Sequence, residues 1–551
     1  MDALSILIPS IAQASPAAPG PARAFGPLDW AALGLYFLIL IAASAWYSRR
    51  KSTTTADYFL AARSMPVWAV AVSILATALS AATFLGVPEQ AYMGDLTYLS
   101  TNLGGLLAII VVALCFIPAF YKQGVTSIYE LLGTRFGLPA QRAASLTFML
   151  GRTLATGARL YMAAIPMALI IFGDDDPAHI TIGVAVLSLV GIIYTLIGGI
   201  RTVIWTDVIQ TAIFLLAITG VIAMLLWRIP ASPDQIVHAL SHPPATDANP
   251  DPPSKLRLFN LSGDPAQAFS LPAVLIGFTL IGLGSYGTDH EITQKMLTCK
   301  SALKGSWSAF LGILVGVPAV ALFLITGLLL NIYYTRPDVM GAAAPAYAPE
   351  AGSRSLLTFI LREMPPGMSG VMIAGLFAAA LSSLNAMSST LIADFYRPLV
   401  KSRSERHYLA AGRAAVVLWG IILGAVACLC ITWHQASKQT LIDFALSVMT
   451  FAYAGLIAAF LTAIFTKRGS NTSVIAALIT GFLVVLMFQP WSWGPFWGWF
   501  TELNPAWTAT PDIADGFRLG ELRLAYPWHL TIGVIVALGV CVLGKRRTPQ
   551  P

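Results

Sequence analysis

Hydroxyl side chains are concentrated in one apolar stretch of the chain, residues 378–390. Ser382 and Ser383 are adjacent there, and a second group of hydroxyls, residues 388–390, follows one helical turn later. Several fixed oxygens of this kind can replace the water shell of a hard cation, so the stretch is a candidate cation site. A hydroxyl in an apolar helix can also bond back to the carbonyl one turn earlier. The pattern alone therefore leaves a purely structural role open.

Two arginines lie inside another apolar stretch, residues 140–172. Arg152 and Arg159 are seven residues apart, which places them on nearly the same face of a helix. Thr156 lies one turn from Arg159 on a similar face. A guanidinium within a membrane requires a partner, and two kinds are open: an acid on a neighbouring helix or an anionic substrate. Snorkelling to the membrane surface is less favoured, because both arginines lie well inside the stretch.

An acid lies inside a third apolar stretch, residues 202–227. Asp207 is about two helical turns inside the apolar run, using about 3.6 residues per turn. A carboxylate at such a depth is costly and commonly functional. Asp207 is therefore a candidate functional residue.

The elements that must position these side chains are transmembrane helices. The 551 residues are 57% hydrophobic and 11% charged, whereas an ordinary soluble domain has about 25% charged residues. This composition excludes a water-soluble fold and a disordered chain. The net charge of +7 comes from Lys and Arg in short loops between apolar runs, which does not indicate a nucleic-acid-binding face. The five cysteines give neither a disulfide framework nor a metal-ligand spacing.

About thirteen apolar segments can span a bilayer, at about 20 residues per span. They cover residues 27–48, 66–92, 97–120, 140–172, 180–198, 202–227, 270–292, 305–330, 368–395, 412–432, 439–465, 472–489 and 527–544. Lys and Arg collect preferentially in cytoplasmic loops. This rule predicts an N-terminus outside and a C-terminus in the cytoplasm. Residues 1–26 are predicted to form a Pro/Ala-rich extracytoplasmic tail or a signal peptide.

Two of these segments contain helix-breaking residues at comparable places, five spans apart. The second segment contains Gly86 and Pro88 just after Ser80 and Thr83, and the seventh contains glycines at 282, 284 and 287. Interruptions of this kind predict discontinuous helices in an inverted-repeat transporter. The glycines could also form a close-packing face between helices.

Taken together, the segments resemble the sodium:solute symporter family, which includes sodium-coupled sugar, proline, pantothenate, iodide and sialic acid carriers. The motifs that carry the resemblance are residues 57–63, 80–86, 129–137, 198–199 with 205–210, 293–297, and 382–383 with 394–396. They appear in the family's order within residues 27 to 470. The resemblance implies an all-α polytopic membrane protein with the LeuT-like 5+5 inverted-repeat fold. A ten-helix core would cover residues 66–466, with one extra helix before it (27–48) and two after it (472–545).

The resemblance also implies a sodium site between the first and eighth core helices. Its backbone carbonyls carry over to Ala76, Leu79 and Ala379, and its hydroxyls to Ser382 and Ser383. Some relatives, the sialic acid carriers among them, form a further sodium site with an acid at the place of Asp207. Asn385 and Ala386 stand where those relatives have serines. We therefore expect Asp207 to be neutral or paired within the protein, and one sodium to accompany each solute.

The substrate residues of the sugar carriers do not carry over. Their places are taken here by Thr83, Gly282, Ser285, Gly312 and approximately Leu446. Ser80 and Thr83 do match the small hydroxyls of the sialic-acid-type site, and Arg159, ahead of Arg152, is the counterpart of an arginine that meets a carboxylate. Thr156 and Ser285 complete the candidate substrate site.

The sequence therefore predicts a sodium-coupled secondary active symporter that imports a small carboxylate-bearing solute by alternating access. Na⁺ would be the coupling ion, and the protein would act as a monomer in the inner membrane. A symporter of a neutral sugar or polyol and a transporter-like solute sensor are the alternatives. An enzyme is not favoured, because His290 is the only histidine in a core helix and no Ser–His pair or metal cluster is evident.

Overall fold

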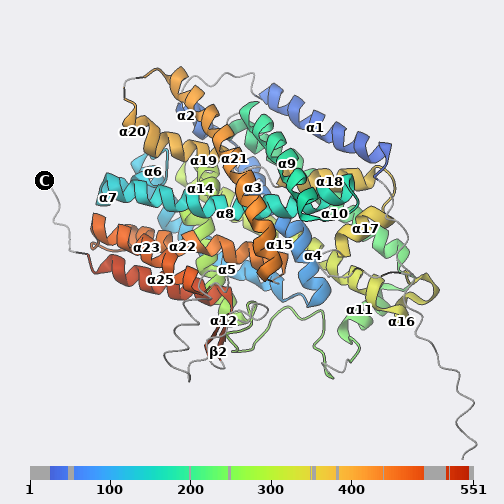
Figure 1. Cartoon of the computed structure of the whole chain (residues 1–551). Coiled ribbons are helices and arrows are strands. Elements are labelled where there is room, and N and C mark those ends of the chain that lie inside the picture. The colour runs from blue at the N-terminus through green and yellow to red at the C-terminus, as the bar shows by residue number, and fades with distance from the viewer. Residues whose placement is uncertain are drawn as a thin grey trace, which may run out of the picture.

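The structure is a computed structural model that describes residues 25–47, 55–197, 200–245, 250–345, 347, 349, 355–379, 384–401, 403–437, 440–488, 517–519 and 522–544. Within these ranges the protein is almost entirely helical (Figure 1). The exception is one antiparallel pair of three-residue strands, β1 (Phe517–Leu519) and β2 (Leu522–Leu524). The predicted all-α class is therefore confirmed.

The helices of the first half of the chain extend to the first long connection. They are α1 (Pro27–Tyr47), α2 (Thr55–Leu60), α3 (Val67–Ala78), α4 (Ala81–Met93), α5 (Thr101–Val111), α6 (Ile117–Gln123), α7 (Glu130–Phe136), α8 (Leu138–Ile171), α9 (Pro177–Ile197), α10 (Ile200–Arg228) and α11 (Pro233–Ser241).

The helices of the second half are more often interrupted. They are α12 (Leu271–Ala273), α13 (Thr279–Leu283), α14 (His290–Leu297), α15 (Ala302–Thr335), α16 (Pro337–Met340), α17 (Ser355–Glu363), α18 (Met368–Ala379), α19 (Leu384–Thr390), α20 (Arg397–Leu399), α21 (Glu405–Ser437), α22 (Leu441–Phe465), α23 (Asn471–Met487) and α25 (Tyr526–Val542).

In the part of the chain that the structure describes, eight helices are long and apolar enough to cross a bilayer, and the bent pair α3–α4 makes a ninth span. Four shorter apolar helices cover Pro177–Ile193, Met368–Phe377, Asn471–Met487 and Tyr526–Val542. Each predicted segment coincides with one of these elements. The chain is thus a multi-pass membrane protein, and the total of thirteen spans stays a prediction.

The first predicted core helix is broken between α3 and α4, which are bent by 63°. Leu79 has φ −78° and ψ 87°, and Ser80 is extended. The Thr83 hydroxyl accepts a hydrogen bond from the Ser80 N–H at 3.3 Å and donates one to the Ala78 carbonyl at 3.1 Å. A break of this kind leaves carbonyls at the end of α3 without helical N–H partners, so they are available to a ligand.

The seventh predicted segment is also discontinuous. It contains π-helical turns at Val274–Phe278 and Gly284–Thr288, and it leaves helical geometry at Asp289 (φ −87°, ψ 118°) before α14 begins. A Cβ on Gly284 would lie 2.5 Å from the Tyr453 ring, and a Cβ on Gly282 would lie 2.6 Å from the Ala108 Cβ. The glycines therefore allow close packing, while the break itself occurs at Asp289. Both sequence interpretations hold, each for a different part of the segment.

Long-range packing places α8 at the centre of the bundle, where it contacts α9, α21 and α22. The broken helix α3–α4 packs on α15, and α23 and α25 pack on α22 (Figure 1). Asp29 near the start of α1 accepts hydrogen bonds from the Gly367 N–H at 2.7 Å and the Ser369 hydroxyl at 2.8 Å. These bonds hold α1 against the start of α18.

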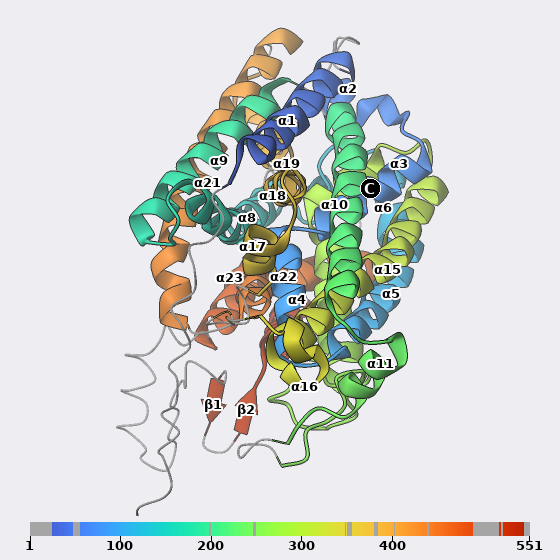
Figure 2. The same ribbon diagram turned by 90° about the vertical axis from the view of Figure 1, so that its right-hand side faces the viewer.

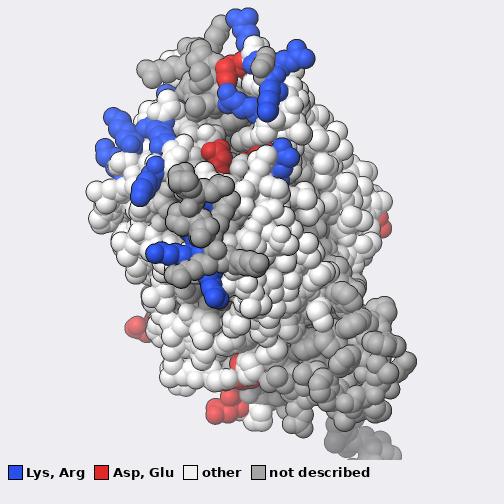
Figure 3. All heavy atoms as spheres, turned by 90° about the vertical axis from the view of Figure 1, so that its left-hand side faces the viewer, with Lys and Arg blue, Asp and Glu red and all other residues white. Residues whose placement is uncertain are grey.

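Basic side chains are numerous on one face of the bundle. Figure 2 shows α11, α16 and the two strands together at one end of the molecule. Figure 3 shows Lys and Arg side chains over the upper and middle parts of another face, the side on which α7 and α20 lie in Figure 1. The direction in which the chain crosses the membrane stays a prediction.

Candidate functional site

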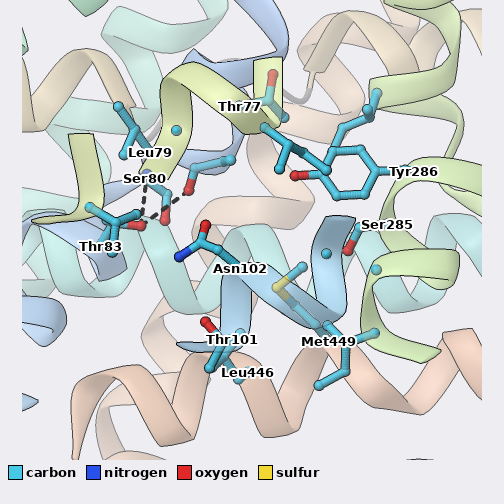
Figure 4. A pocket seen from close by; sticks show the side chains of 18 of the residues that line it. Thr77, Leu79, Ser80, Thr83, Thr101, Asn102, Ser285, Tyr286, Leu446 and Met449 are labelled. Carbon is cyan, nitrogen blue, oxygen red and sulfur yellow. Dashed lines mark hydrogen bonds between the residues drawn. The ribbon is translucent and has the colours of Figure 1, made fainter. Parts of the chain in front are cut away.

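A cavity of about 190 Å³ lies at the break between α3 and α4 and is bordered by α5, α8, α15 and α22. Figure 4 shows Ser80 and Thr83 on one side of this cavity, Ser285 and Tyr286 on the other, and Asn102 between them. The polar lining residues are Thr77, Ser80, Thr83, Tyr98, Thr101, Asn102, Arg152, Arg159, Ser285, Tyr286 and Tyr453. The remaining lining is apolar, with Met449 and Leu446 contributed by α22.

Several of the polar lining groups already have partners within the protein. Thr101 donates from its hydroxyl to the Tyr98 carbonyl at 2.7 Å, and Asn102 donates from its amide to the Leu99 carbonyl at 3.0 Å. The Ser285 hydroxyl lies 3.4 Å from the Tyr453 hydroxyl, and Thr83 caps α4. These bonds use up many of the donors that a polyhydroxylated ligand would require.

Arg159 is the cationic side chain of the lining that has no acidic partner in the described part of the chain. It is 8% exposed, and its Nη2 atom lies 3.5 Å from the sulfur of Met449. No described carboxylate lies within 4.0 Å of its guanidinium. Asp289 therefore acts on this guanidinium only from a distance, and the charge has no described acid in contact with it.

Arg152 has different surroundings, although it lines the same cavity. Its Nη1 atom lies 3.1 Å from Asp289 Oδ2, and its Nη2 atom forms an ion pair with Glu291. Tyr453 donates its hydroxyl to the same Asp289 oxygen at 3.1 Å. The sequence left two kinds of partner open for a buried arginine, an acid of the protein or an anionic substrate. Arg152 has the acid of the protein.

Asp207 does not line the solute cavity. It forms an ion pair with Lys295 of α14, with 2.7 Å between Nζ and Oδ2, and both side chains are about 1% exposed. Ser73 donates its hydroxyl to the same carboxylate. The acid expected to be neutral or paired within the protein is paired.

The carbonyl-bearing residues expected at the sodium site lie beside a second, small cavity. Ala76 and Leu79 of the broken helix line it together with Gly375 of α18 and Gln210 and Thr211 of α10. Its volume of about 10 Å³ suits one water-sized occupant. Ala379 is the last residue of α18, whereas Ser382 and Ser383 lie outside the described residues. Two of the three residues expected to offer carbonyls thus meet at one small cavity, and the sodium site stays a prediction.

Most of the residues predicted for the substrate site meet at the first cavity. Ser80, Thr83, Arg152, Arg159 and Ser285 line it, as do Gly282, Gly312 and Leu446 at the places of the sugar carriers' binding residues. Thr156 does not line it; that residue is 2% exposed, and its hydroxyl has no hydrogen-bond partner among the described residues.

The polar lining residues that the sequence reasoning missed are Thr77, Tyr98, Thr101, Asn102, Tyr286 and Tyr453. An asparagine inside an apolar stretch, such as Asn102, is a signal that could have been used. The tyrosines carry no such signal, because aromatic residues are common throughout these stretches.

Comparisons with known proteins agree on one family. The model of the sodium:solute symporter family matches residues 58–481. The sodium/sialic acid symporter of Proteus mirabilis is 29% identical over 471 residues, which cover 84% of this chain and 89% of that protein. Human sodium-coupled monocarboxylate transporter 1 is 26% identical over 83% of this chain and 70% of its own length. The human sodium/iodide cotransporter is 26% identical over 85% of this chain and 70% of its own length.

A solved structure shows the same fold. It is the substrate-bound, outward-open state of a Na⁺-coupled sialic acid symporter, with a TM-score of 0.74 at 24% identity. The match covers 95% of this chain and all of that one. The predicted LeuT-like fold is therefore confirmed.

Proposed function

Because this chain belongs to the sodium:solute symporter family, we propose that it imports a small carboxylate-bearing solute together with sodium. Na⁺ is the coupling ion of the family's relatives and is taken here as a transported substrate. The relatives and the structural neighbour are transporters and not enzymes. The chemistry is binding followed by alternating access, with no covalent step.

Arg159 is the observation that carries the carboxylate. A guanidinium held within the membrane is costly unless an anion or polar group meets it, and the described residues place no carboxylate in contact with it. The planar fork of arginine suits bidentate pairing with a carboxylate. Arg159 therefore clamps the carboxylate of the solute, and Ser80 and Thr83 contact its polar end.

The rest of the lining indicates what the body of the solute should be. Apolar side chains predominate around the cavity, and Thr83, Thr101 and Asn102 already donate within the protein. An acid with an apolar body and few hydroxyls leaves fewer unpaired groups there than a polyol does. One relative is a sialic acid symporter and another is a monocarboxylate transporter, and both support a carboxylate.

The sodium ion is proposed to bind beside Ala76 and Leu79, at the small cavity between α3, α10 and α18. Carbonyl oxygens at the end of α3 and of α18, at Ala379, would be joined there by the hydroxyls of Ser382 and Ser383. Because the cavity adjoins the break in the first core helix, an ion there would fix the geometry of the same break that lines the solute cavity.

The placement in the cell follows from the loop charges and the bacterial relatives. We infer an inner-membrane protein with the end that carries α2 and α20 in the cytoplasm, the N-terminus outside and the C-terminus inside. The ten-helix core would cover residues 66–466, and a single copy of the chain would complete the transport path.

Uptake by proteoliposomes tests this proposal. Labelled sialic acid, short monocarboxylates, proline, pantothenate, hexoses and myo-inositol would be offered with an inward sodium gradient and, as the control, an equal potassium gradient. At least one carboxylate should accumulate only with sodium. Sodium-driven accumulation of a hexose or myo-inositol, with no acid transported, would replace the proposal with the neutral-solute alternative.

A further inference from the structure

Lys295 is a fully buried ammonium surrounded by oxygens from two other helices. It lies in α14 and is 1% exposed. Its Nζ atom donates to Asp207 Oδ2 of α10 at 2.7 Å, to the Ser73 carbonyl of α3 at 3.0 Å, and to the Thr77 hydroxyl of α3. The three oxygens are of three kinds: carboxylate, carbonyl and hydroxyl.

This set of oxygens is one that a hard monovalent cation could also use. Such ions take carboxylate, carbonyl and hydroxyl oxygens at close range, and an ammonium donates to the same three atoms. The Ser73 hydroxyl contacts the carboxylate as well, which would add a fourth oxygen after the ammonium is removed. The lysine thus occupies a place with the chemistry of a cation site.

We propose that these oxygens form a second cation site of the transporter, which the chain fills with its own Lys295 ammonium. A tethered cation neutralises Asp207 but cannot cross the membrane. The site would therefore add no ion to the transport stoichiometry, and removal of the ammonium would open it to a mobile cation. This proposal rests on the proposed function, because it concerns the number of ions coupled to each solute.

The position of the site explains why its occupant would matter for transport. Ser73 and Thr77 belong to the last two turns of α3 before the break at Leu79. Thr77 also lines the solute cavity, and Ala76 beside it lines the small cavity expected to hold sodium. An occupant that bonds Ser73 and Thr77 therefore acts on the helix end that both binding sites share.

A second connection leads through α10. The Thr211 hydroxyl donates to the Asp207 carbonyl at 2.7 Å, and both Thr211 and Gln210 line the small cavity. Asp207 consequently lies one turn from residues beside the expected sodium ion. Its charge would be felt there, because a buried carboxylate is poorly screened.

The neighbouring charges do not offer Asp207 another partner. Arg152 is already paired with Asp289 and Glu291, so its charge is compensated within that group. Without Lys295 the Asp207 carboxylate would be buried with no described cation in contact, and a buried unpaired charge strongly favours uptake of a counter-ion.

The charge moved per solute is the measurement that tests the proposal. Proteoliposomes with a defined sodium gradient would be clamped with potassium and valinomycin, and the potential at which net solute flux reverses would be determined. The solute would be the acid that the uptake panel identifies. The wild-type protein should move one charge per sodium, with one sodium for each solute, after correction for the charge of the anion.

Lys295→Met keeps an unbranched side chain one atom shorter than lysine and removes the ammonium. It should raise the ratio from one sodium to two and make the sodium dependence of uptake steeper. Two controls are matched to it. Lys295→Arg retains a tethered cation and should stay at one, and the double variant Lys295→Met with Asp207→Asn removes both charges and should return to one.

Two results would overturn the proposal: a wild-type ratio of two, or a Lys295→Met protein whose ratio remains one with unchanged sodium dependence. If Lys295→Met is recovered only in unfolded form, the wild-type ratio and the double variant still decide the matter. A wild-type ratio of two contradicts a tethered ion, and a ratio of two in the double variant contradicts a cation site built on the Asp207 carboxylate. Failure of the wild-type protein to take up any solute with sodium would instead remove the proposed function.

Discussion

Arg152 and Arg159 lie on one helix, α8, and line one cavity, yet the regions around them are opposite in character. Around Arg152 two acids and a tyrosine close a charged group within the protein. Around Arg159 the described residues offer a hydrogen bond to a methionine sulfur at 3.5 Å and no acid in contact. The position of an arginine on a helix face therefore determines whether its side chain reaches the cavity. Acids on elements far away in the sequence determine whether its charge is already neutralised within the protein.

The largest effect on stability is expected from breaking the charged group formed by Arg152, Asp289 and Glu291. Arg152→Met leaves Asp289 and Glu291 buried without their cation, and breaking a buried pair in this way costs about 3–5 kcal/mol. The variant should therefore yield little monodisperse protein in detergent and a much lower apparent melting temperature. Arg152→Lys, the control, should recover part of the loss. If Arg152→Met has wild-type stability and loses only solute binding, then Arg152, and not Arg159, is the arginine that binds the solute.

Loss of an ion ligand should come next in size. Ser382→Ala or Ser383→Ala should abolish or sharply weaken sodium-dependent solute binding, because nothing in a low-dielectric site replaces a lost oxygen. Solute affinity measured across a sodium titration checks this expectation. Ser73→Ala, which removes a hydroxyl that contacts Asp207 on the same broken helix, serves as a comparison. Sodium dependence of wild-type strength in both serine variants would remove these hydroxyls from the site.

A smaller effect, limited to solute affinity, is expected from a change at Arg159. Arg159→Lys keeps the charge but loses the planar fork, so solute affinity should fall by about 1–3 kcal/mol, roughly the value of a charge-assisted hydrogen bond. Sodium binding without solute and the melting temperature should change little. Isothermal titration of both ligands separates these quantities. If Arg159→Lys instead fails to fold, Arg159 has a structural partner within the protein, as Arg152 has.

The smallest effect concerns a cation outside the spans. Lys255 donates from Nζ to the Tyr92 and Gly94 carbonyls at 3.0 and 2.9 Å, at the end of α4. Burial lowers the pKa of Lys255 to about 8, from 10.5, although Asp95 opposes the shift. Between these values the unfolded chain binds more protons than the folded one, so this lysine makes stability rise as pH increases from about 8 to 10.5.

Lys255→Met should remove that rise. Apparent melting temperatures of the wild type and the variant, measured from pH 7.5 to 10, should therefore differ in slope. Lys304→Met changes an exposed lysine at the other end of the bundle and is the control. Equal slopes in Lys255→Met and the wild type would show that Lys255 does not titrate in this window.

Much of the fold could be predicted from the sequence, because apolar length and broken periodicity are local properties. The break at Leu79 and Ser80 lies just before the hydroxyl motif that signals it, whereas Gly86 and Pro88 of the same signal lie inside α4. In the seventh segment the glycines mark contacts with Ala108 and Tyr453. The break two residues beyond the last of them, at Asp289, carries no glycine or proline.

The site was less accessible to sequence reasoning, because it depends on which distant side chains meet. The spacing of Arg152 and Arg159 placed both on one face, but only Asp289, 137 residues away, separates their roles. The pairing of Asp207 with Lys295 is likewise a tertiary contact. Thr156 has the spacing of a lining residue and points elsewhere, since helical periodicity does not fix where the edge of a cavity falls.

The central claim is that Arg159 is left open for a carboxylate that moves with sodium. Its most direct test is to record transport currents from wild-type and Arg159→Gln proteoliposomes on a solid-supported membrane. Each acid of the uptake panel would be applied beside its own primary amide, with sodium and then with potassium. We predict sodium-dependent currents from at least one acid, none from its amide, and loss of the acid's current at low concentration in Arg159→Gln. An amide that drives currents as well as its acid does, or an Arg159→Gln protein with wild-type affinity for the acid, would contradict the account.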